Sequence, residues 1–408
     1  MSVIAPWNIK NPTAILILAD GSIIEGKGCG ATGFVYAEIC FNTSLTGYQE
    51  ILTDSSYLGQ IVNFTFPHIG NVGVNNDDCE SLSTTSFKGA VGIVIKADIT
   101  DPSNYRSNMH FDNWLKSYGI IGLLGIDTRA LTIWIRENGV SNAVIAHNPS
   151  GQFDIEYLQG NMKHSNALKG KDGVTKCNGL KGVELAKHAT ILQNRDWLEK
   201  SWKWGQGKSF LSKDNSEYHV VCIDYGVKAN ILRILADLGC RITIVKADTS
   251  EEAVLDLCPD GVLLSNGPGD PAITSSYSSP VICSLVASGI PIFGICLGHQ
   301  LLGIALGAQS VKMHQGHHGA NHPVKNLLTG KVEIVSMNHG FVIDSDTLPA
   351  GVEETHISLF DNSNCGLRVV DKPVFSVQHH PESSPGPQDS HYLFDCFLDF
   401  MREKKGLC

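Results

Sequence analysis

The sequence is poor in three features, and each absence excludes a class of protein. Its longest apolar stretches, such as Ala14–Ala19, fall far short of the roughly 18 residues that a membrane-spanning helix needs. Met1–Lys10 has no basic stretch followed by an apolar one, so we expect no signal peptide and a cytoplasmic protein. Lys and Arg form no run, and they total 31 against 41 Asp and Glu, a net charge of −10. Such an acidic chain is a poor binder of nucleic acid or anionic membranes.

Cysteine patterning is also missing. The twelve Cys among 408 residues form no CxxC pair and no regular framework. This favours reduced thiols over disulfides or a zinc site, so a Cys with a special role must be found by its local setting. The composition, with 42% hydrophobic and 18% charged residues, is that of an ordinary globular protein. At this length we expect two or three domains.

Three regions follow one another along the chain. Residues 1–150 are predicted to form a β-rich α+β domain, because short β-rich runs are broken by Gly, Asn and Asp turns. Residues 151–215 lack this pattern and are interpreted as a connecting region with short helices. The first region is expected to have strands over 14–19, 34–41, 60–66, 90–95 and 143–146, and helices over 113–117 and 128–137.

Residues 216–408 are predicted to form an α/β domain on a parallel sheet, because strand-like and helical segments alternate there. Thr249 and Glu252 are spaced as a capping box. Active sites in such sheets form at the carboxyl ends of the strands. The expected strands are 219–223, 241–245, 261–264, 290–295 and 374–378, and the expected helices are 229–238, 248–257, 280–288, 297–307 and 392–401.

The sharpest motif is Gly294-Ile295-Cys296-Leu297-Gly298, where a buried strand is predicted to turn into a helix. Small residues two positions on either side of Cys296 allow a tight turn that exposes the central side chain, as in a nucleophile elbow. A thiol at a helix N-terminus is favoured as the thiolate, and the Leu297 N–H is placed to stabilise an oxyanion. The alternative is a buried structural cysteine.

A cysteine nucleophile needs a base, and the base needs an orienting group. His380-Pro381-Glu382 follows a predicted strand of the same domain. His380 and Glu382 are two residues apart and can share one side of an extended segment, with Pro381 fixing the backbone between them. The carboxylate can then orient the imidazole and stabilise its charged form.

These motifs resemble a known family. Gly294–Gln300 with His380-Pro381-Glu382 is similar to the class I (triad) glutamine amidotransferases, and further motifs resemble the small chain of carbamoyl-phosphate synthetase. The resemblance implies a C-terminal class I amidotransferase domain preceded by the small-chain N-terminal domain. The further motifs are Phe41–Asp54, Pro67–Gly73, Ile126–Arg129, Ser265–Pro271, Gly316–Pro323 and Ser358–Asp361.

The resemblance also implies roles for individual residues. Cys296 would be the nucleophile, His380 the general base and acid, and Glu382 its partner. The Gly269 N–H would be the second oxyanion donor. Glutamine would be held by Ser44, Gly267, Gly269, Leu297, Gln300, Asn338, Gly340 and Phe341.

Partners and cofactors follow from the same resemblance. It implies a large ATP-dependent chain that receives ammonia from this one, for arginine and pyrimidine synthesis, with possible higher oligomers of the heterodimer. No cofactor is expected here, since Gly207-Lys208-Ser209 lacks the first glycine and the strand of a phosphate-binding loop, and ATP and Mg²⁺ belong to the large chain. Two alternatives stay open: a glutaminase for another synthetase, such as one making GMP or anthranilate, and a catalytically silent regulatory subunit.

Three further signals are interpreted as structural or uncertain. Gly28–Gly33 fits G-x-G-x-x-G but is followed by a predicted strand, so we interpret its glycines as turn residues. Four histidines within 314–322 lack an interleaved Cys or carboxylate, which favours a loop near the active site or a subunit contact over a metal site. His379 stands where the small chains usually have Gly, and its spacing to Glu382 is wrong for the base.

Overall fold

The structure is a computed structural model that describes residues 11–82, 88–162, 179–212 and 216–406. The predicted absence of a signal peptide concerns residues outside this range. The chain forms two compact units. The first unit comprises Met1–Cys79, Phe87–Lys181 and His314–His318, and the second comprises Glu80–Ser86, Gly182–Met313 and Gly319–Cys408. None of the helices among the described residues is long and apolar enough to cross a bilayer.

The described part of the first unit contains a closed seven-stranded sheet in the order β1-β2-β6-β5-β4-β3-β7. β3, β4, β5 and β6 pair in parallel, and the other pairs are antiparallel. The sequence predicted most of these strands but not their order. The strands are β1 (Ala14–Leu18), β2 (Ile23–Gly30), β3 (Gly33–Asn42), β4 (Gln60–Phe64), β5 (Gly92–Ile95), β6 (Ile121–Leu124) and β7 (Ser141–His147).

Both faces of this sheet are buried, which explains the apolar run at β1. Leu16 and Leu18 pack in one core cluster, and Ile15 and Ile17 pack in another, as the alternation of side chains along a strand requires. α3 and α4 supply apolar side chains to these two clusters, while α1 and α2 pack in a third. The helices are α1 (Tyr48–Thr53), α2 (Phe111–Ser117), α3 (Thr128–Asn138) and α4 (Ile155–Met162).

The second unit contains, among the described residues, a ten-stranded sheet in the order β14-β13-β15-β16-β17-β12-β11-β9-β10-β8. The central strands β10, β9, β11, β12 and β17 are parallel, as the sequence predicted. The strands are β8 (Arg195–Trp197), β9 (Tyr218–Asp224), β10 (Cys240–Lys246), β11 (Gly261–Leu264), β12 (Ile292–Ile295), β13 (Ser310–Asn326), β14 (Val332–Ile343), β15 (Val352–Ser358), β16 (Asn364–Val369) and β17 (Val374–Val377).

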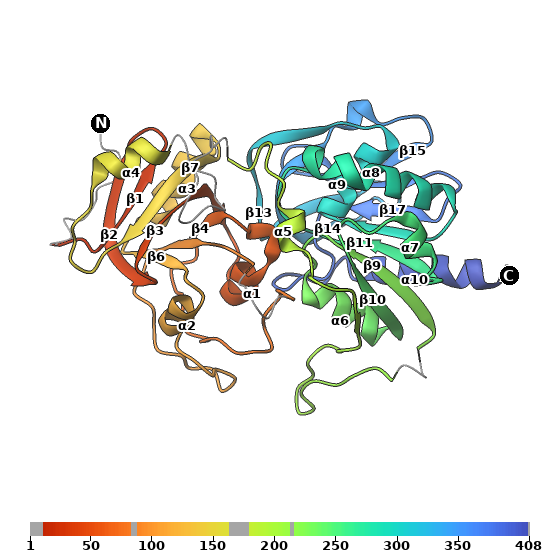
Figure 1. The fold of residues 1–408 in the computed structure, drawn as a ribbon, viewed down its shortest axis with the longest axis horizontal. Helices are drawn as coiled ribbons and strands as arrows, with labels where there is room; N and C mark the ends of the chain where they lie inside the picture. The colour runs from red at the N-terminus through yellow and green to blue at the C-terminus, as the bar shows by residue number, and fades with distance from the viewer. Residues whose placement is uncertain (1–10, 83–87, 163–178, 213–215, 407–408) are drawn as a thin grey trace. The chain divides into compact units, whose positions relative to one another are not determined.

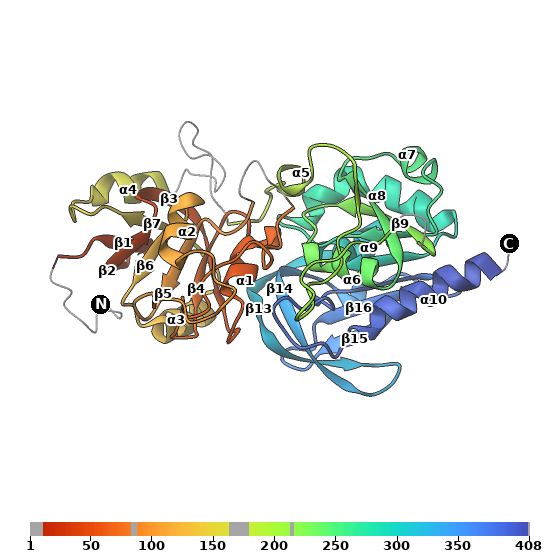
Figure 2. The ribbon, with the colours of Figure 1, turned by 90° about the horizontal axis from the view of Figure 1, so that it is seen from below.

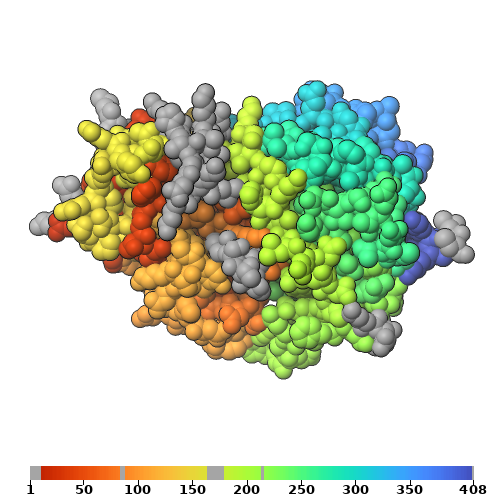
Figure 3. Space-filling view, viewed as in Figure 1, coloured from red at the N-terminus to blue at the C-terminus, as the bar shows by residue number. Residues whose placement is uncertain are grey.

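Helices cover both faces of the parallel strands (Figures 1 and 2). α6 (Ala229–Asp237) and α10 (Tyr392–Gly406) pack in one apolar cluster, with Val220 and Cys222 of β9. α7 (Glu251–Leu255), α8 (Pro271–Ala287) and α9 (Leu297–Leu306) pack in the other, with Val221 and Ile223. The short α5 (Ala186–Ala189) precedes β8. The blue atoms of α10 reach the surface of this unit in Figure 3, while Phe394, Phe397 and Met401 on the same helix are buried.

Two local predictions in this unit are wrong. The helix expected over 280–288 begins at Pro271, because Asp270 caps it by accepting from the Ala272 N–H and Pro271 suits the first turn. The capping box at Thr249 is not formed. Ser250 is the N-cap instead, and its hydroxyl accepts from the Ala253 N–H at 3.3 Å.

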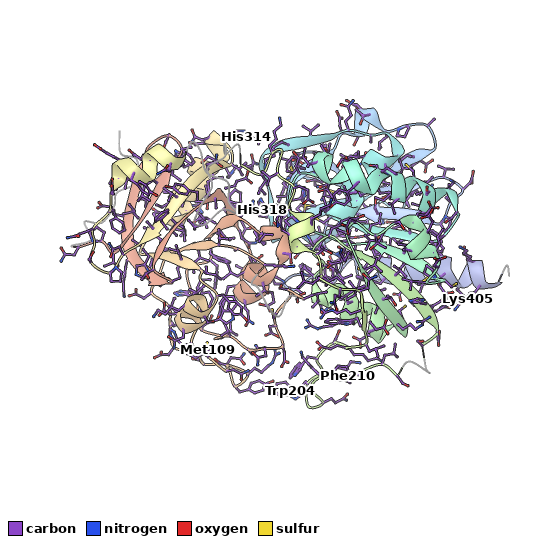
Figure 4. The ribbon with its side chains drawn as sticks, in the orientation of Figure 1. Met109, Trp204, Phe210, His314, His318 and Lys405 are labelled. Carbon is purple, nitrogen blue, oxygen red and sulfur yellow. The ribbon has the colours of Figure 1, made fainter. Side chains whose placement is uncertain are left out.

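The histidine-rich segment is also not a loop. His314, His317, His318 and His322 lie in the long strand β13, along which Figure 4 labels two of them. His318 belongs to the first unit, where its ring lies 6.0 Å from that of Tyr57 and 6.4 Å from that of Phe41. The glycines that separate the histidines are compatible with a strand, so their spacing gave no reliable sign of a loop. Gly28 and Gly30 likewise lie in β2 rather than in a turn.

Candidate active site

Cys296 lies between β12 and α9, at the carboxyl edge of the parallel strands. Its backbone has φ 54° and ψ −102°, a sparsely populated conformation for a residue with a side chain. The two glycines of the motif permit this turn, because a Cβ on Gly298 would lie 2.1 Å from the Leu264 oxygen and one on Gly294 would lie 2.9 Å from the Gly298 oxygen. The nucleophile elbow predicted from the sequence is therefore present.

The surroundings of the thiol are polar although Cys296 is only 2% exposed. Its sulfur lies 3.5 Å from the Asn338 carbonyl oxygen and 3.6 Å from the Gln378 side-chain nitrogen. The Cys296 N–H donates to the Val377 oxygen at 2.9 Å, which ties the elbow to β17. The first N–H groups of a helix have no partner within the helix, so the start of α9 offers donors beside the sulfur.

His380 is reached through the neighbouring strand β17, which pairs in parallel with β12. Its N–H donates to the Ser336 oxygen at 2.9 Å, and its Nδ1 lies 2.7 Å from Glu382 Oε1. Its Nε2 is buried and has no hydrogen-bond partner of ordinary geometry among the described residues. Burial would lower the pKa of His380, but the charge of Glu382 and the proximity of the Cys296 thiol outweigh it and raise that pKa to about 10.

Glu382 is fully buried and carries a compensated charge. Lys228, from the segment after β9, donates to Glu382 Oε1 at 2.7 Å and to the Ser383 oxygen at 2.6 Å. Burial alone would raise the pKa of Glu382, but Lys228 and then His380 lower it to about 2. The carboxylate therefore stays ionised and holds a proton on His380. Lys228 was not predicted from the sequence, although its place after a strand of the parallel sheet was a usable signal.

Several residues predicted to hold glutamine lie around the same thiol. Gln300, on α9, donates to the Phe341 oxygen at 2.7 Å and to Gln378 Oε1 at 3.0 Å. Asn338, Gly340 and Phe341 all lie in β14. Gln378 was not predicted, although it immediately precedes the two histidines. These contacts link α9, β14 and β17 beside Cys296.

The remaining predicted residues are divided between the units. Gly267 packs against the elbow, because a Cβ there would lie 2.2 Å from the Tyr225 oxygen and 3.0 Å from Leu297. Gly269, in the same loop after β11, has a φ of +101° that favours glycine. Ser44 belongs to the first unit, where its N–H donates to Asn42 Oδ1 at 2.8 Å, and its role stays a prediction.

His379 is buried beside the triad and differs from His380 in every relevant contact. Neither of its ring nitrogens has a hydrogen-bond partner among the described residues. Burial, and then the neighbouring His356, hold the pKa of His379 well below its usual value. Its ring centroid lies 5.6 Å from that of His356. A neutral imidazole without a carboxylate partner is unsuited to the acid–base role, which supports the choice of His380.

Among the described residues, no group of three or more His, Cys, Asp or Glu side chains could hold a metal ion.

Known proteins are similar to this chain over nearly its whole length. The family model of glutamine amidotransferase class-I matches residues 221–400, and that of the carbamoyl-phosphate synthase small chain, CPSase domain, matches residues 16–145. The carbamoyl phosphate synthase small chain of Rhizobium meliloti is 64% identical over 406 residues, covering 100% of this chain and 98% of its own. That of Agrobacterium fabrum is 63% identical with the same coverage. That of Bartonella henselae is 60% identical over 400 residues, covering 98% of this chain and 97% of its own. The chain therefore belongs to the carbamoyl phosphate synthase small chain family, and its second half is a class I glutamine amidotransferase domain.

Proposed function

We propose that this chain is the glutaminase subunit of a glutamine-hydrolysing carbamoyl-phosphate synthase, with Cys296, His380 and Glu382 as its catalytic triad. The observation that carries the proposal is the ionised, buried Glu382 in contact with His380 Nδ1, together with the interaction between the His380 and Cys296 side chains that helps to raise the pKa of His380. These groups meet at the carboxyl edge of a parallel sheet in a chain of the matching family.

The first half of the reaction forms a thioester. His380 holds the proton that the Cys296 thiol gives up, and the resulting thiolate attacks the side-chain amide carbon of glutamine. The resulting oxyanion is stabilised by the N–H groups of Leu297 and Gly269. His380 then gives its proton to the departing nitrogen, so ammonia leaves and a γ-glutamyl thioester remains. The pKa of His380, about 10, keeps the imidazole protonated at neutral pH for this step.

The second half releases glutamate. After the proton has left with ammonia, His380 is neutral, and its Nε2 can accept a proton from water as the water oxygen attacks the thioester carbon. The thiolate of Cys296 leaves and recovers that proton from His380. Each cycle thus consumes one glutamine and one water and yields glutamate and ammonia. Glu382 orients the imidazole throughout, and Lys228 compensates its buried charge.

Glutamine is proposed to be held by the residues that the family resemblance implies. Gln300 is held in one position beside the sulfur by its hydrogen bonds to the Phe341 oxygen and to Gln378, which supports its role in positioning glutamine. The Asn338 carbonyl is close to the sulfur and can accept a hydrogen bond from a bound substrate. The proposed glutamine-binding residues are Ser44, Gly267, Gly269, Leu297, Gln300, Asn338, Gly340 and Phe341.

A second enzyme must use the ammonia that this chain is proposed to release. We propose that a carbamoyl-phosphate synthetase large chain binds this chain as a heterodimer, which can assemble into higher oligomers, and uses ATP and Mg²⁺ to make carbamoyl phosphate for arginine and pyrimidine synthesis. This chain itself is proposed to need no cofactor, to act in the cytoplasm, and to bind neither nucleic acid nor membrane. Its family supports the large chain as partner and glutamine as substrate.

The test is co-purification with the large chain followed by assays with glutamine and with ammonia. We expect synthesis from both nitrogen sources in the complex. Absence of glutamine-dependent synthesis, with ammonia-dependent synthesis intact, would favour the silent regulatory subunit. Labelling with iodoacetamide at neutral pH separates the two readings further: Cys296 is expected to react and to be protected by glutamine, while the exposed Cys258 serves as an unprotected control.

A further inference from the structure

Glu80 is a buried carboxylate that the catalytic mechanism does not use. It follows the first unit's residues in the sequence, yet it belongs to the second unit and is only 1% exposed. It lies outside residues 221–400, which match the amidotransferase family model. An acidic side chain is rarely buried unless it is paired and hydrogen-bonded, so its contacts indicate what it does.

One set of contacts is with the start of α6. The Glu80 carbonyl oxygen accepts from the Ala229 N–H at 3.0 Å, and its Oε2 accepts from the Asn230 N–H at 2.9 Å. A carboxylate at this position satisfies N–H groups that the helix cannot satisfy itself and is favoured by the helix dipole. The N-cap residue Lys228 has no capping side-chain bond. Glu80 therefore supplies the cap from a distant part of the chain.

The second set of contacts is with the segment after Glu382. Glu80 Oε1 accepts from the Ser384 hydroxyl at 2.6 Å. Ser383 and Ser384 both have positive φ values, 61° and 58°, which residues with side chains adopt at a cost and only when their surroundings hold them. Arg233 also faces Glu80 Oε1, at 3.7 Å.

The two sets of contacts meet at Glu382. Asn230 donates its side-chain amide to the Glu382 carbonyl oxygen at 2.7 Å, and Lys228 donates to its carboxylate at 2.7 Å. The first turn of α6 thus holds Glu382 directly, and Glu80 fixes both that turn and the strained residues that follow Glu382.

We propose that Glu80 is a positioning residue of the glutaminase site, acting through Asn230 and Ser384 on Glu382 and through Glu382 on His380. This inference rests on the proposed function. Without the Glu80 carboxylate, Glu382 loses its fixed distance to His380, and His380 is less strongly held in its protonated form. Glutamine binding should change little, because the Glu80 contacts described above are with α6 and Ser384 and not with the residues proposed to hold the substrate.

The test compares Glu80→Ala and Glu80→Gln with wild type in the assembled enzyme. We expect kcat for glutamine hydrolysis to fall about 10- to 100-fold in Glu80→Ala, the range typical when the partner of a site residue is removed, with KM for glutamine nearly unchanged. The alkaline limb of the kcat/KM profile, which reports proton loss from His380 in the free enzyme, should move toward neutral pH. Ser384→Ala, which removes only the Ser384 hydroxyl from the contacts of the Glu80 carboxylate, should show a smaller loss.

Glu199→Gln is the matched control. Glu199 accepts from Arg233 at 3.0 Å, as part of the same charge cluster, but among the described residues its side chain pairs with Arg233 and Lys208 rather than with the first turn of α6 or Ser384. It should keep the wild-type kcat and pH profile. Ammonia-dependent synthesis should be unchanged in all variants, which also verifies folding and assembly. If Glu80→Ala misfolds, Glu80→Gln is used for the test instead, because it keeps the side-chain volume and removes only the charge.

A folded Glu80→Ala or Glu80→Gln enzyme with the wild-type kcat and alkaline limb would overturn the proposal, and so would an equal loss in Glu199→Gln. Failure of the proposed function looks different. In that case the wild-type complex itself hydrolyses no glutamine, whatever stands at position 80.

Discussion

Each unit of the molecule buries a glutamate, and the two carboxylates are held in different ways. In the first unit, Glu38 is 3% exposed and accepts hydrogen bonds from two neutral donors: Oε1 accepts from the Gln60 side chain and Oε2 from the Leu180 N–H, each at 3.1 Å. In the second unit, Glu382 is fully buried, its Oε1 contacts both Lys228 and His380, and its Oε2 has no partner within the described ranges.

The difference separates a structural carboxylate from a reactive one. Buried polar groups that stabilise a fold have their hydrogen-bonding capacity used, as Glu38 does between β3 and β4. Buried groups that act on a substrate keep some hydrogen-bonding atoms unpaired. Two such atoms lie at the triad, Glu382 Oε2 and His380 Nε2. The contacts of Glu382 also carry charge, because its carboxylate lies 2.7 Å from the Lys228 ammonium and 2.7 Å from the His380 imidazole.

The largest expected effect is at the nucleophile that Glu382 serves. Cys296→Ser should reduce glutamine-dependent synthesis by at least about 10⁴-fold, because a hydroxyl at this elbow cannot replace the thiolate. Synthesis from added ammonia should persist. Steady-state assays of the complex with each nitrogen source measure this, and a parallel loss with ammonia would contradict the division of labour between the chains.

Glu382→Gln should have the next largest effect. The amide keeps the volume but removes the charge that keeps His380 protonated, and it leaves the buried Lys228 ammonium without its carboxylate. We expect kcat for glutamine hydrolysis to fall about 10²-fold, less than in Cys296→Ser, because the residue orients rather than reacts. A rate as low as that of Cys296→Ser would require Glu382 to take part in the chemistry itself.

Glu38→Gln is the same substitution in the other unit and sharpens the comparison. One of the two donors to Glu38 would face an amide N–H₂ group, so the free energy of unfolding should fall by about 1–2 kcal/mol, the usual cost of an unsatisfied buried group. Glutamine hydrolysis should keep its wild-type kcat. Chemical denaturation and steady-state assays check the two parts, and a loss of kcat in a fully folded variant would blur the distinction between the carboxylates.

At neutral pH the smallest effect is expected from the second histidine, whose contribution appears in the pH dependence of stability. The pKa of His379 lies well below the ordinary value of about 6.5, so below pH 6.5 the unfolded chain binds one proton more than the folded one. Folded stability therefore falls on acidification, and His379→Phe should reduce this fall by about 1.4 kcal/mol per pH unit. Thermal unfolding of wild type and of His379→Phe at pH 7 and at pH 5, one value on each side of the ordinary pKa, measures this difference in stability. An identical pH dependence in the two proteins would mean that His379 does not stay neutral in the folded state.

Sequence reasoning found the parts of the site that are local in the chain. Cys296 with its two glycines is one such part, because the elbow is a strand-to-helix turn encoded by adjacent residues. His380 and Glu382 are another, since their spacing determines their contact. The parallel direction of the central strands in the second unit was predicted from the alternation of strands and helices.

The missed features depend on contacts between distant segments. Lys228 and Glu80 reach Glu382 and Ser384 across more than a hundred residues of sequence, and no local pattern reports such a pairing. Gln378 adjoins the histidine motif, but its bond to Gln300 depends on how α9 packs on β17. The helix start at Pro271 was not predicted although Asp270 is a good N-cap, because Pro280 lies inside the helix, where proline is disfavoured and normally indicates a helix start.

The most direct test of the account is to trap the reaction intermediate. Wild-type complex mixed with labelled glutamine, quenched in acid within one turnover and digested, should yield one γ-glutamyl group attached through a thioester to the peptide that contains Cys296. Cys296→Ser should yield none. A glutamyl group on any other residue, or hydrolysis of glutamine without any covalent species in either protein, would contradict the assignment of Cys296 as the nucleophile.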